Sequence, residues 1–227
     1  MCAAGTRRWR RGRALLPEVR LSDGLAALAA EIRACRICRD LSPRPLPHEP
    51  RPVVMPSSTA RILIAGQAPG TRVHASGRPF TDPSGDRLRN WLGVDAESFY
   101  DPDNFAIVPM GFCFPGLDAK GGDLPPRREC APAWRMRLMA LMPQVDLVLA
   151  IGLHAQAWHL GAARKTSLTE TVAAWRDIVE ARTPMVLPLP HPSWRNSGWL
   201  KRNPWFEEEL LPFLRAQVRT RLKPGVG

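Results

Sequence analysis

Residues 61–66 read RILIAG, a short apolar run that ends in a glycine. Three similar runs follow along the chain, each bounded by turn residues: FAIVPM (105–110), LVLAIG (147–152) and MVLPLP (185–190). Continuous runs of leucine and β-branched residues of this length are typical of strands that are buried on both faces. The four runs therefore predict the strands of a buried parallel sheet.

Helical patterns surround these runs, whereas residues 41–60 contain six prolines, show no periodic pattern and are expected to form a wrapping loop. The alternation of strands and helices predicts an α/β fold, a three-layer α/β/α arrangement with a central four-stranded parallel sheet in a single domain. We expect this domain to span residues 21–219, between a basic, disordered tail (1–20) and a short tail (220–227). The predicted helices are 21–36, with Ser22 as its N-cap, Ser84–Leu92, Ala131–Met142, Leu153–Leu160, Leu168–Ala181 and Pro204–Arg219.

The charge of the chain points to a polyanionic partner. Its formal net charge of +11 favours nucleic acid first and an anionic membrane second. No apolar run approaches the roughly 20 residues that a membrane helix needs, and no signal peptide is visible. The cysteine count, five, is odd, which argues against a disulfide framework. We therefore expect a monomeric cytoplasmic protein that binds DNA and no membrane.

The segments that follow the predicted strands are the candidates for chemistry, because open parallel sheets bind ligands at the carboxyl ends of their strands. The first strand ends in GQAPG (66–70), a turn whose backbone N–H groups can face a ligand. SGRPF (76–80) and SGD (84–86) come next, and the fourth strand ends in HPSWRN (191–196). Taken singly, the turn fits a phosphate site or a structural turn, and the histidine fits a structural role as well as a catalytic one.

Together, these segments resemble the signature motifs of uracil-DNA glycosylases. Gly66–Gly70 resembles the first motif and His191–Ser193 the second, while Gly77–Phe80 resembles the base-stacking segment of the thermophile-type enzymes that carry an iron–sulfur cluster. Ser84–Asp86 and the His-Pro-Ser piece look closer to a related iron–sulfur group that accepts several deaminated bases. The resemblance spans residues 25–215. It implies a DNA repair enzyme that flips uracil, or another deaminated base, out of DNA and hydrolyses its N-glycosidic bond, leaving an abasic site.

The same resemblance implies roles for individual residues. Phe80 would stack on the flipped base, and His191 would stabilise the anion that leaves. Gln67 would act beside His191 and hydrogen-bond the polar edge of the base. The backbone that completes this edge belongs to Ala68, Pro69 and Gly70. The implied DNA-binding residues are Ser193, Trp194, Arg195 and Asn196.

Three positions depart from the pattern. The iron–sulfur enzymes usually carry Glu where this chain has Gln67, and the mainstream enzymes carry a water-positioning Asp where it has Ala68. Asp86 is our candidate to orient the water instead; its alternative role is that of an N-terminal helix charge or cap. Pro109 stands where many uracil enzymes have an Asn that reads the pyrimidine edge, so strict uracil selectivity is not expected.

Four cysteines lie at matching places. Cys35 and Cys38 form a C-x2-C pair, Cys113 follows the second predicted strand, and Cys130 comes after a glycine- and proline-rich loop. Four thiolates can hold a [4Fe–4S] cluster or a tetrahedral zinc, and buried free cysteines are the third reading. The resemblance implies the cluster, with a structural role.

Two other functions stay open at this point. The missing Asp and Asn fit a non-catalytic protein that binds damaged or single-stranded DNA, which would release no base from uracil-containing DNA. A nucleotide-binding α/β protein, whose Gly66–Gly70 turn holds a free nucleotide phosphate, would bind a mononucleotide tightly and DNA weakly.

Overall fold

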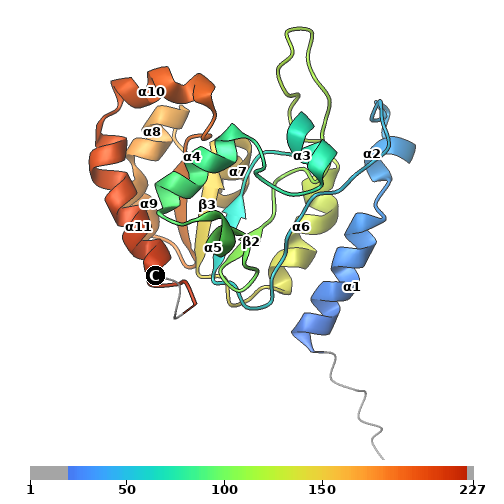
Figure 1. Cartoon of the computed structure of the whole chain (residues 1–227), viewed down its shortest axis with the longest axis horizontal. Helices are drawn as coiled ribbons and strands as arrows, with labels where there is room; N and C mark the ends of the chain where they lie inside the picture. Colours follow the sequence, from blue (N-terminus) through green and yellow to red (C-terminus); the bar gives the residue numbers. More distant parts are fainter. Residues whose placement is uncertain (1–19, 224–227) are drawn as a thin grey trace, which may run out of the picture.

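The computed structural model describes residues 20–223, which build a central sheet of four parallel strands (Figure 1). Each predicted run contains one strand, shorter than the run itself, and the predicted α/β fold class is confirmed. The strands pair in the order β2-β1-β3-β4. Their bounds are β1 (Ile62–Ala65), β2 (Phe105–Ile107), β3 (Leu147–Ile151) and β4 (Met185–Leu189).

Successive side chains of each strand enter two separate hydrophobic cores. In β1, Leu63 and Ala65 face the core that is closed by α1 (Leu21–Arg33), α6 (Cys130–Ala140) and α7 (Gly152–Leu160). Ile62 and Ile64 face the opposite core. Because both faces are covered, every strand position is apolar, which explains the unbroken runs. The helices of the opposite core are α4 (Pro83–Leu92), α5 (Ala96–Tyr100), α8 (Leu168–Ala173), α9 (Trp175–Glu180) and α11 (Leu211–Arg219).

Some predicted helix boundaries were wrong. The first helix begins at Leu21 after Arg20, and Ser22 lies inside its first turn, where its hydroxyl contacts Asp23 instead of capping the helix. The helix predicted over 168–181 is divided into α8 and α9 at Ala174, whose backbone leaves the helical region.

The last predicted helix, Pro204–Arg219, is also not uniform. It opens with a π-helical segment, Phe206–Leu210, before α11. Pro212 has no N–H to donate, so the regular hydrogen-bond ladder is interrupted there.

Several short helices were not predicted from the sequence. With no more than six residues each, they are too short to show a 3.6-residue period. They are α2 (Ile37–Asp40), α3 (Thr71–Ser76), α5, α10 (Ser197–Arg202) and the 3-10 turns Gly161–Ala163 and Trp194–Asn196.

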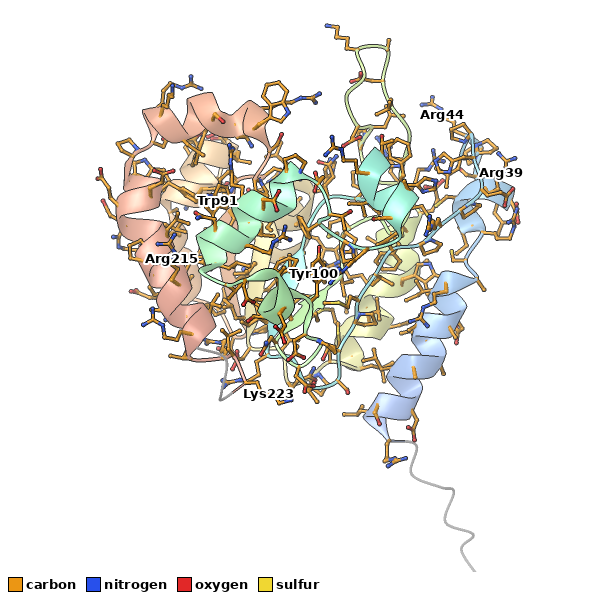
Figure 2. The ribbon with its side chains drawn as sticks, in the orientation of Figure 1. Arg39, Arg44, Trp91, Tyr100, Arg215 and Lys223 are labelled. Atoms are coloured by element: carbon orange, nitrogen blue, oxygen red, sulfur yellow. The ribbon has the colours of Figure 1, made fainter. Side chains whose placement is uncertain are left out.

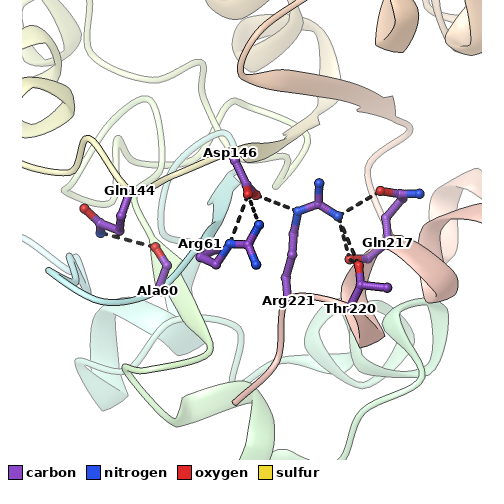
Figure 3. Close-up of polar contacts among 7 residues, drawn as sticks. All are labelled: Ala60, Arg61, Gln144, Asp146, Gln217, Thr220 and Arg221. Atoms are coloured by element: carbon purple, nitrogen blue, oxygen red, sulfur yellow. Dashed lines mark hydrogen bonds and ion pairs between the residues drawn. The ribbon is translucent and has the colours of Figure 1, made fainter. Parts of the chain in front are cut away.

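Residues that follow α11 form ion pairs with the rest of the fold. Beyond residue 219, Arg221 donates to Asp146 at 2.6 Å, and Asp146 also pairs with Arg61, the residue before β1 (Figure 3). Lys223 pairs with Asp103 at 2.7 Å. Of the predicted tails, 1–20 lies outside the described part of the chain except for Arg20, and 220–227 lies outside it from residue 224 onward. Within residues 20–223, no helix has the length and apolarity to cross a bilayer.

The strand order predicts a crevice at the carboxyl ends of the strands. The chain leaves β1 toward β2 on one side and leaves β3 toward β4 on the other, so the connections diverge between β1 and β3. Ligands of open parallel sheets bind at such a switch point, outside the carboxyl ends of the strands.

Candidate active site

A pocket lies at this carboxyl edge, with an empty volume of about 530 Å³ that includes the part open to solvent. All residues predicted to bind a base meet here, because the turn after β1, the segment before α4 and the end of β4 converge. The pocket lining includes Gln67, Ala68, Pro69, Gly70, Phe80, Asp82, Ser84, Pro109, Asp123 and His191.

Phe80 forms an aromatic wall of this pocket. Its ring tip lies 3.5 Å from the place where a Cβ on Gly66 would stand, so the ring covers the turn after β1. Phe99 packs edge-to-face against it, with 6.0 Å between ring centroids. The ring is therefore supported on one side and faces the pocket, as a stacking surface requires.

His191 follows β4 and is held through its backbone. Its carbonyl accepts a hydrogen bond from the Asn196 side chain at 2.7 Å. Burial lowers the pKa of His191, and the nearby carboxylates of Asp82 and Asp123 oppose that shift. The imidazole is therefore neutral at pH 7 and carries one N–H donor. That donor can stabilise negative charge on a bound molecule.

Two carboxylates that the sequence reasoning missed line the pocket with His191. Asp82 is the residue before the first turn of α4, yet its side chain caps no N–H group of that helix. Asp123 comes from the loop between β2 and α6, and burial raises the pKa of its carboxyl group. An Asp followed by Pro83 is a recognisable helix start, so Asp82 had a sequence signal. Asp123 had none.

Asp86, the residue predicted to orient water, is not brought to the pocket. Its carboxylate is 78% exposed and accepts a hydrogen bond of 2.6 Å from Arg89 on the surface of α4. Asp86 lies in the first turn of that helix, where a negative charge offsets the helix dipole.

A wider groove opens at the mouth of the pocket. Arg72, Leu117, Ser193, Trp194 and Arg195 line it, and 70% of the Trp194 surface is exposed. The predicted DNA-binding residues thus lie together, except that the Asn196 side chain turns back to His191. The exposed aromatic ring and the two guanidinium groups suit the bases and phosphates of a nucleic acid.

Helix α4 fixes the segment that carries Trp194. Arg87 donates to the Ser193 carbonyl at 2.9 Å and to the Ser197 hydroxyl at 3.2 Å. The groove and the pocket are therefore anchored to the same helix.

Cys35, Cys38, Cys113 and Cys130 line a second cavity, with an empty volume of about 360 Å³ that includes open space. The Phe112 N–H donates to the Cys130 sulfur at 3.3 Å. Burial raises the pKa of Cys38, and raises that of Cys113 and of Cys130 to about 12. In the described part of the chain, no three His, Cys, Asp or Glu side chains lie close enough together to hold one metal ion. The cysteines thus share a cavity but are not drawn to one point.

A buried arginine contacts the backbone that follows β2. Arg135 of α6 donates to the carbonyls of Val108 and Pro109 at 3.0 Å each, and its guanidinium lies 2.6 Å from Nε2 of His159. Burial lowers the pKa of Arg135 to about 10, so it stays charged at neutral pH. Burial and the neighbouring arginines Arg135 and Arg182 lower the pKa of His159 to about 3, so His159 is a neutral acceptor. This contact fixes the carboxyl end of β2 beside the pocket.

The chain matches a known protein family over most of its length. The profile described as the uracil DNA glycosylase superfamily matches residues 52–215. The matched range includes the whole pocket lining, Cys113 and Cys130, whereas Cys35 and Cys38 precede it.

Proposed function

Since the chain belongs to the uracil DNA glycosylase superfamily, we propose that it hydrolyses the N-glycosidic bond of uracil and of other deaminated bases in DNA. The observation that carries this proposal is the pocket that unites Phe80, Gln67 and His191 at the carboxyl edge of the sheet. A base inside a duplex cannot reach such a pocket, so the enzyme must flip it out of the stack.

Base binding relies on stacking and on the turn after β1. Phe80 stacks on the flipped base, a contact that typically contributes about 1–3 kcal/mol. The amide of Gln67 makes only a long hydrogen bond of 3.4 Å to the Leu124 carbonyl, so it can exchange that bond for the edge of a base. Pro109 offers no side-chain hydrogen bond, which supports a substrate range wider than uracil.

Bond cleavage separates charge between the sugar and the base, and we assign to His191 the stabilisation of the negative charge on the base. The sugar becomes oxocarbenium-like while the base leaves as an anion. The neutral imidazole donates its N–H to the O2 atom of a leaving uracil. A buried donor aimed at developing charge typically supplies roughly 3–4 kcal/mol.

Water must then attack the sugar, and we assign its orientation to Asp82 instead of Asp86. Asp82 lines the pocket and is free of a capping bond, so its carboxylate can accept a hydrogen bond from water. Asp86 faces solvent and pairs with Arg89.

The groove outside the pocket is our proposed path for the DNA strand. Trp194 fills the space that the flipped base leaves, while Arg195 and Ser193 hold neighbouring phosphates. Asn196 acts indirectly, because its side chain holds the His191 backbone.

We also propose that Cys35, Cys38, Cys113 and Cys130 hold a [4Fe–4S] cluster. Their shared cavity and the N–H bond to the Cys130 sulfur support it, since such bonds are typical of iron–sulfur sites. A tetrahedral zinc ion is the alternative occupant of the same four thiolates. The cluster would tie the end of α1 to α6 and to the loop after β2, a structural role, because hydrolysis transfers no electron.

Anaerobic purification tests the cluster. The protein should be brown and contain about four irons per chain. Colourless protein with one zinc would reject the cluster but keep the cross-link. Colourless protein without metal would mean that the thiols pack as small apolar groups.

A panel of oligonucleotides tests the activity. Duplexes with uracil, hypoxanthine or xanthine should yield abasic sites, and the matched undamaged duplex should not. DNA that is bound tightly but yields no abasic site with any of these bases would favour a non-catalytic DNA-binding protein.

A further inference from the structure

Phe80 has an unusual backbone conformation. Its φ is +54°, and between residues 20 and 223 it is the one non-glycine residue with a positive φ. Bulky L residues rarely adopt this region, and they remain there only when their surroundings hold them. The conformation occurs at the residue that forms the aromatic wall of the pocket, so the contacts that hold it bear on base binding.

Two side chains hold the backbone of Phe80. The Tyr100 hydroxyl donates to the Pro79 carbonyl at 2.8 Å and to the Phe80 carbonyl at 3.1 Å. Arg89 donates to the same Phe80 carbonyl at 3.3 Å. Tyr100 is the last residue of α5 (Figure 2), and Arg89 belongs to α4. Side chains of both helices therefore hold this segment through hydrogen bonds.

The Tyr100 ring is itself fixed. Phe99 packs edge-to-face against it at 5.0 Å, and the guanidinium carbon of Arg78 lies 3.5 Å from its centroid. The hydroxyl therefore points at the two carbonyls from a rigid support.

The close approach of α4 completes the arrangement. A Cβ on Gly85 would lie 1.9 Å from the Phe80 carbonyl oxygen, so only glycine fits there. The helix backbone thus limits how far the Phe80 carbonyl can turn.

We propose that Tyr100 is a positioning residue, which holds the Phe80 ring in its base-stacking orientation before the base arrives. This inference rests on the proposed function. Without the hydroxyl, the Phe80 backbone can relax toward an ordinary φ and carry the ring away from the pocket wall. The fraction of enzyme with a formed stacking surface then falls, and excision falls with it.

Tyr100→Phe tests this, because it removes the hydroxyl and keeps the ring. The single-turnover excision rate at saturating enzyme should fall about five- to tenfold, as for loss of a hydrogen bond. Affinity for undamaged duplex and the melting temperature should stay near the wild-type values. The matched control is Thr171→Val, which removes a hydroxyl that donates to the Ser167 carbonyl at 2.7 Å on α8, away from the pocket lining. It should leave the rate unchanged.

The outcomes separate the two proposals. An inactive wild-type enzyme would reject the glycosylase function, whereas an active wild type with an equally active Tyr100→Phe variant would overturn the role of Tyr100. An equal loss of rate in Thr171→Val would also overturn it, since any weakened fold would then slow excision.

A second readout does not depend on activity. Tyr100 is the only tyrosine of the chain, so incorporated 3-fluorotyrosine gives one ¹⁹F resonance. Phe80→Ala should shift this resonance and Thr171→Val should not. An unchanged resonance in Phe80→Ala would overturn the proposed contact whatever the catalytic result.

Discussion

At the scale of single residues, two aspartates about one helical turn apart have different surroundings. Asp82 lines the pocket near His191, and Asp86 faces solvent beside Arg89. Both belong to the start of α4: Asn is as good as Asp at the N-cap, the position of Asp82, and loss of the exposed Asp86 charge weakens its interaction with the helix dipole only slightly. Exchanging either carboxylate for an amide therefore changes its charge with little effect on folding.

The Asp82→Asn variant should lose about 100-fold of its single-turnover excision rate, because the amide is a poor acceptor for a water proton. Asp86→Asn is the matched control, and its rate should stay within about twofold of wild type, as for an exposed surface charge. Duplex binding and melting temperature should be near normal in both. A slow Asp86→Asn enzyme beside a normal Asp82→Asn enzyme would reverse the assignment.

At the scale of elements, Arg135 joins α6 to the end of β2 through a hydrogen bond to a backbone carbonyl. Its guanidinium also donates to the neutral imidazole of His159 in α7. The pKa of His159 is about 3 in the fold, against about 6.5 for an ordinary histidine. Below pH 6.5, His159 is therefore protonated in the unfolded chain but stays neutral in the folded chain. The free energy of unfolding falls as the pH drops from 6.5 toward 3. His159 alone lowers it by about 2 kcal/mol between pH 7 and pH 5.

His159→Gln tests this, because the glutamine oxygen can still accept from Arg135 but does not titrate. Urea midpoints at pH 7 and pH 5 should drop less in the variant than in wild type. Other histidines with lowered pKa values contribute equally to both proteins, so the difference isolates His159. Equal drops would show that His159 is protonated without cost in the fold.

The elements also show what the sequence could predict. The four strands were predictable, because a strand buried between two helical layers is apolar at every position, as in β1 and β3. The pocket residues that follow β1 and β4 were predictable for the same reason, since strand ends fix their place. The short helices were not, because one or two turns show no period.

Residues positioned by long-range packing were also out of reach. Asp123 reaches the pocket because its loop packs on the turn after β1: a Cβ on Gly70 would lie 3.2 Å from the Asp123 carboxylate, and one on Gly111 only 2.9 Å from Pro126. No local pattern encodes such a contact. The hydrogen bond from Tyr100 to the Phe80 carbonyl also depends on long-range packing, since 20 positions separate the two residues in the chain.

At the scale of the whole molecule, the net charge of +11 and the cationic groove predict salt-sensitive DNA binding. The logarithm of affinity should fall linearly with the logarithm of salt concentration, with a slope near −0.9 for each phosphate contact. Arg72→Ala and Arg195→Ala should each make the slope shallower by about one contact. Arg137→Ala is the control, because Arg137 pairs with Glu31 between α6 and α1. Binding that ignores salt would favour a small-molecule ligand.

The central claim, that the pocket around His191 excises deaminated bases, is tested most directly by detecting the released base. Wild-type protein and His191→Ala would be incubated with a uracil-containing duplex under single-turnover conditions, and free uracil would be measured by mass spectrometry. Wild type should release uracil, and His191→Ala should release it about 100-fold more slowly, as for loss of a donor aimed at developing negative charge. Equal release by both proteins, or release by neither, would contradict the account.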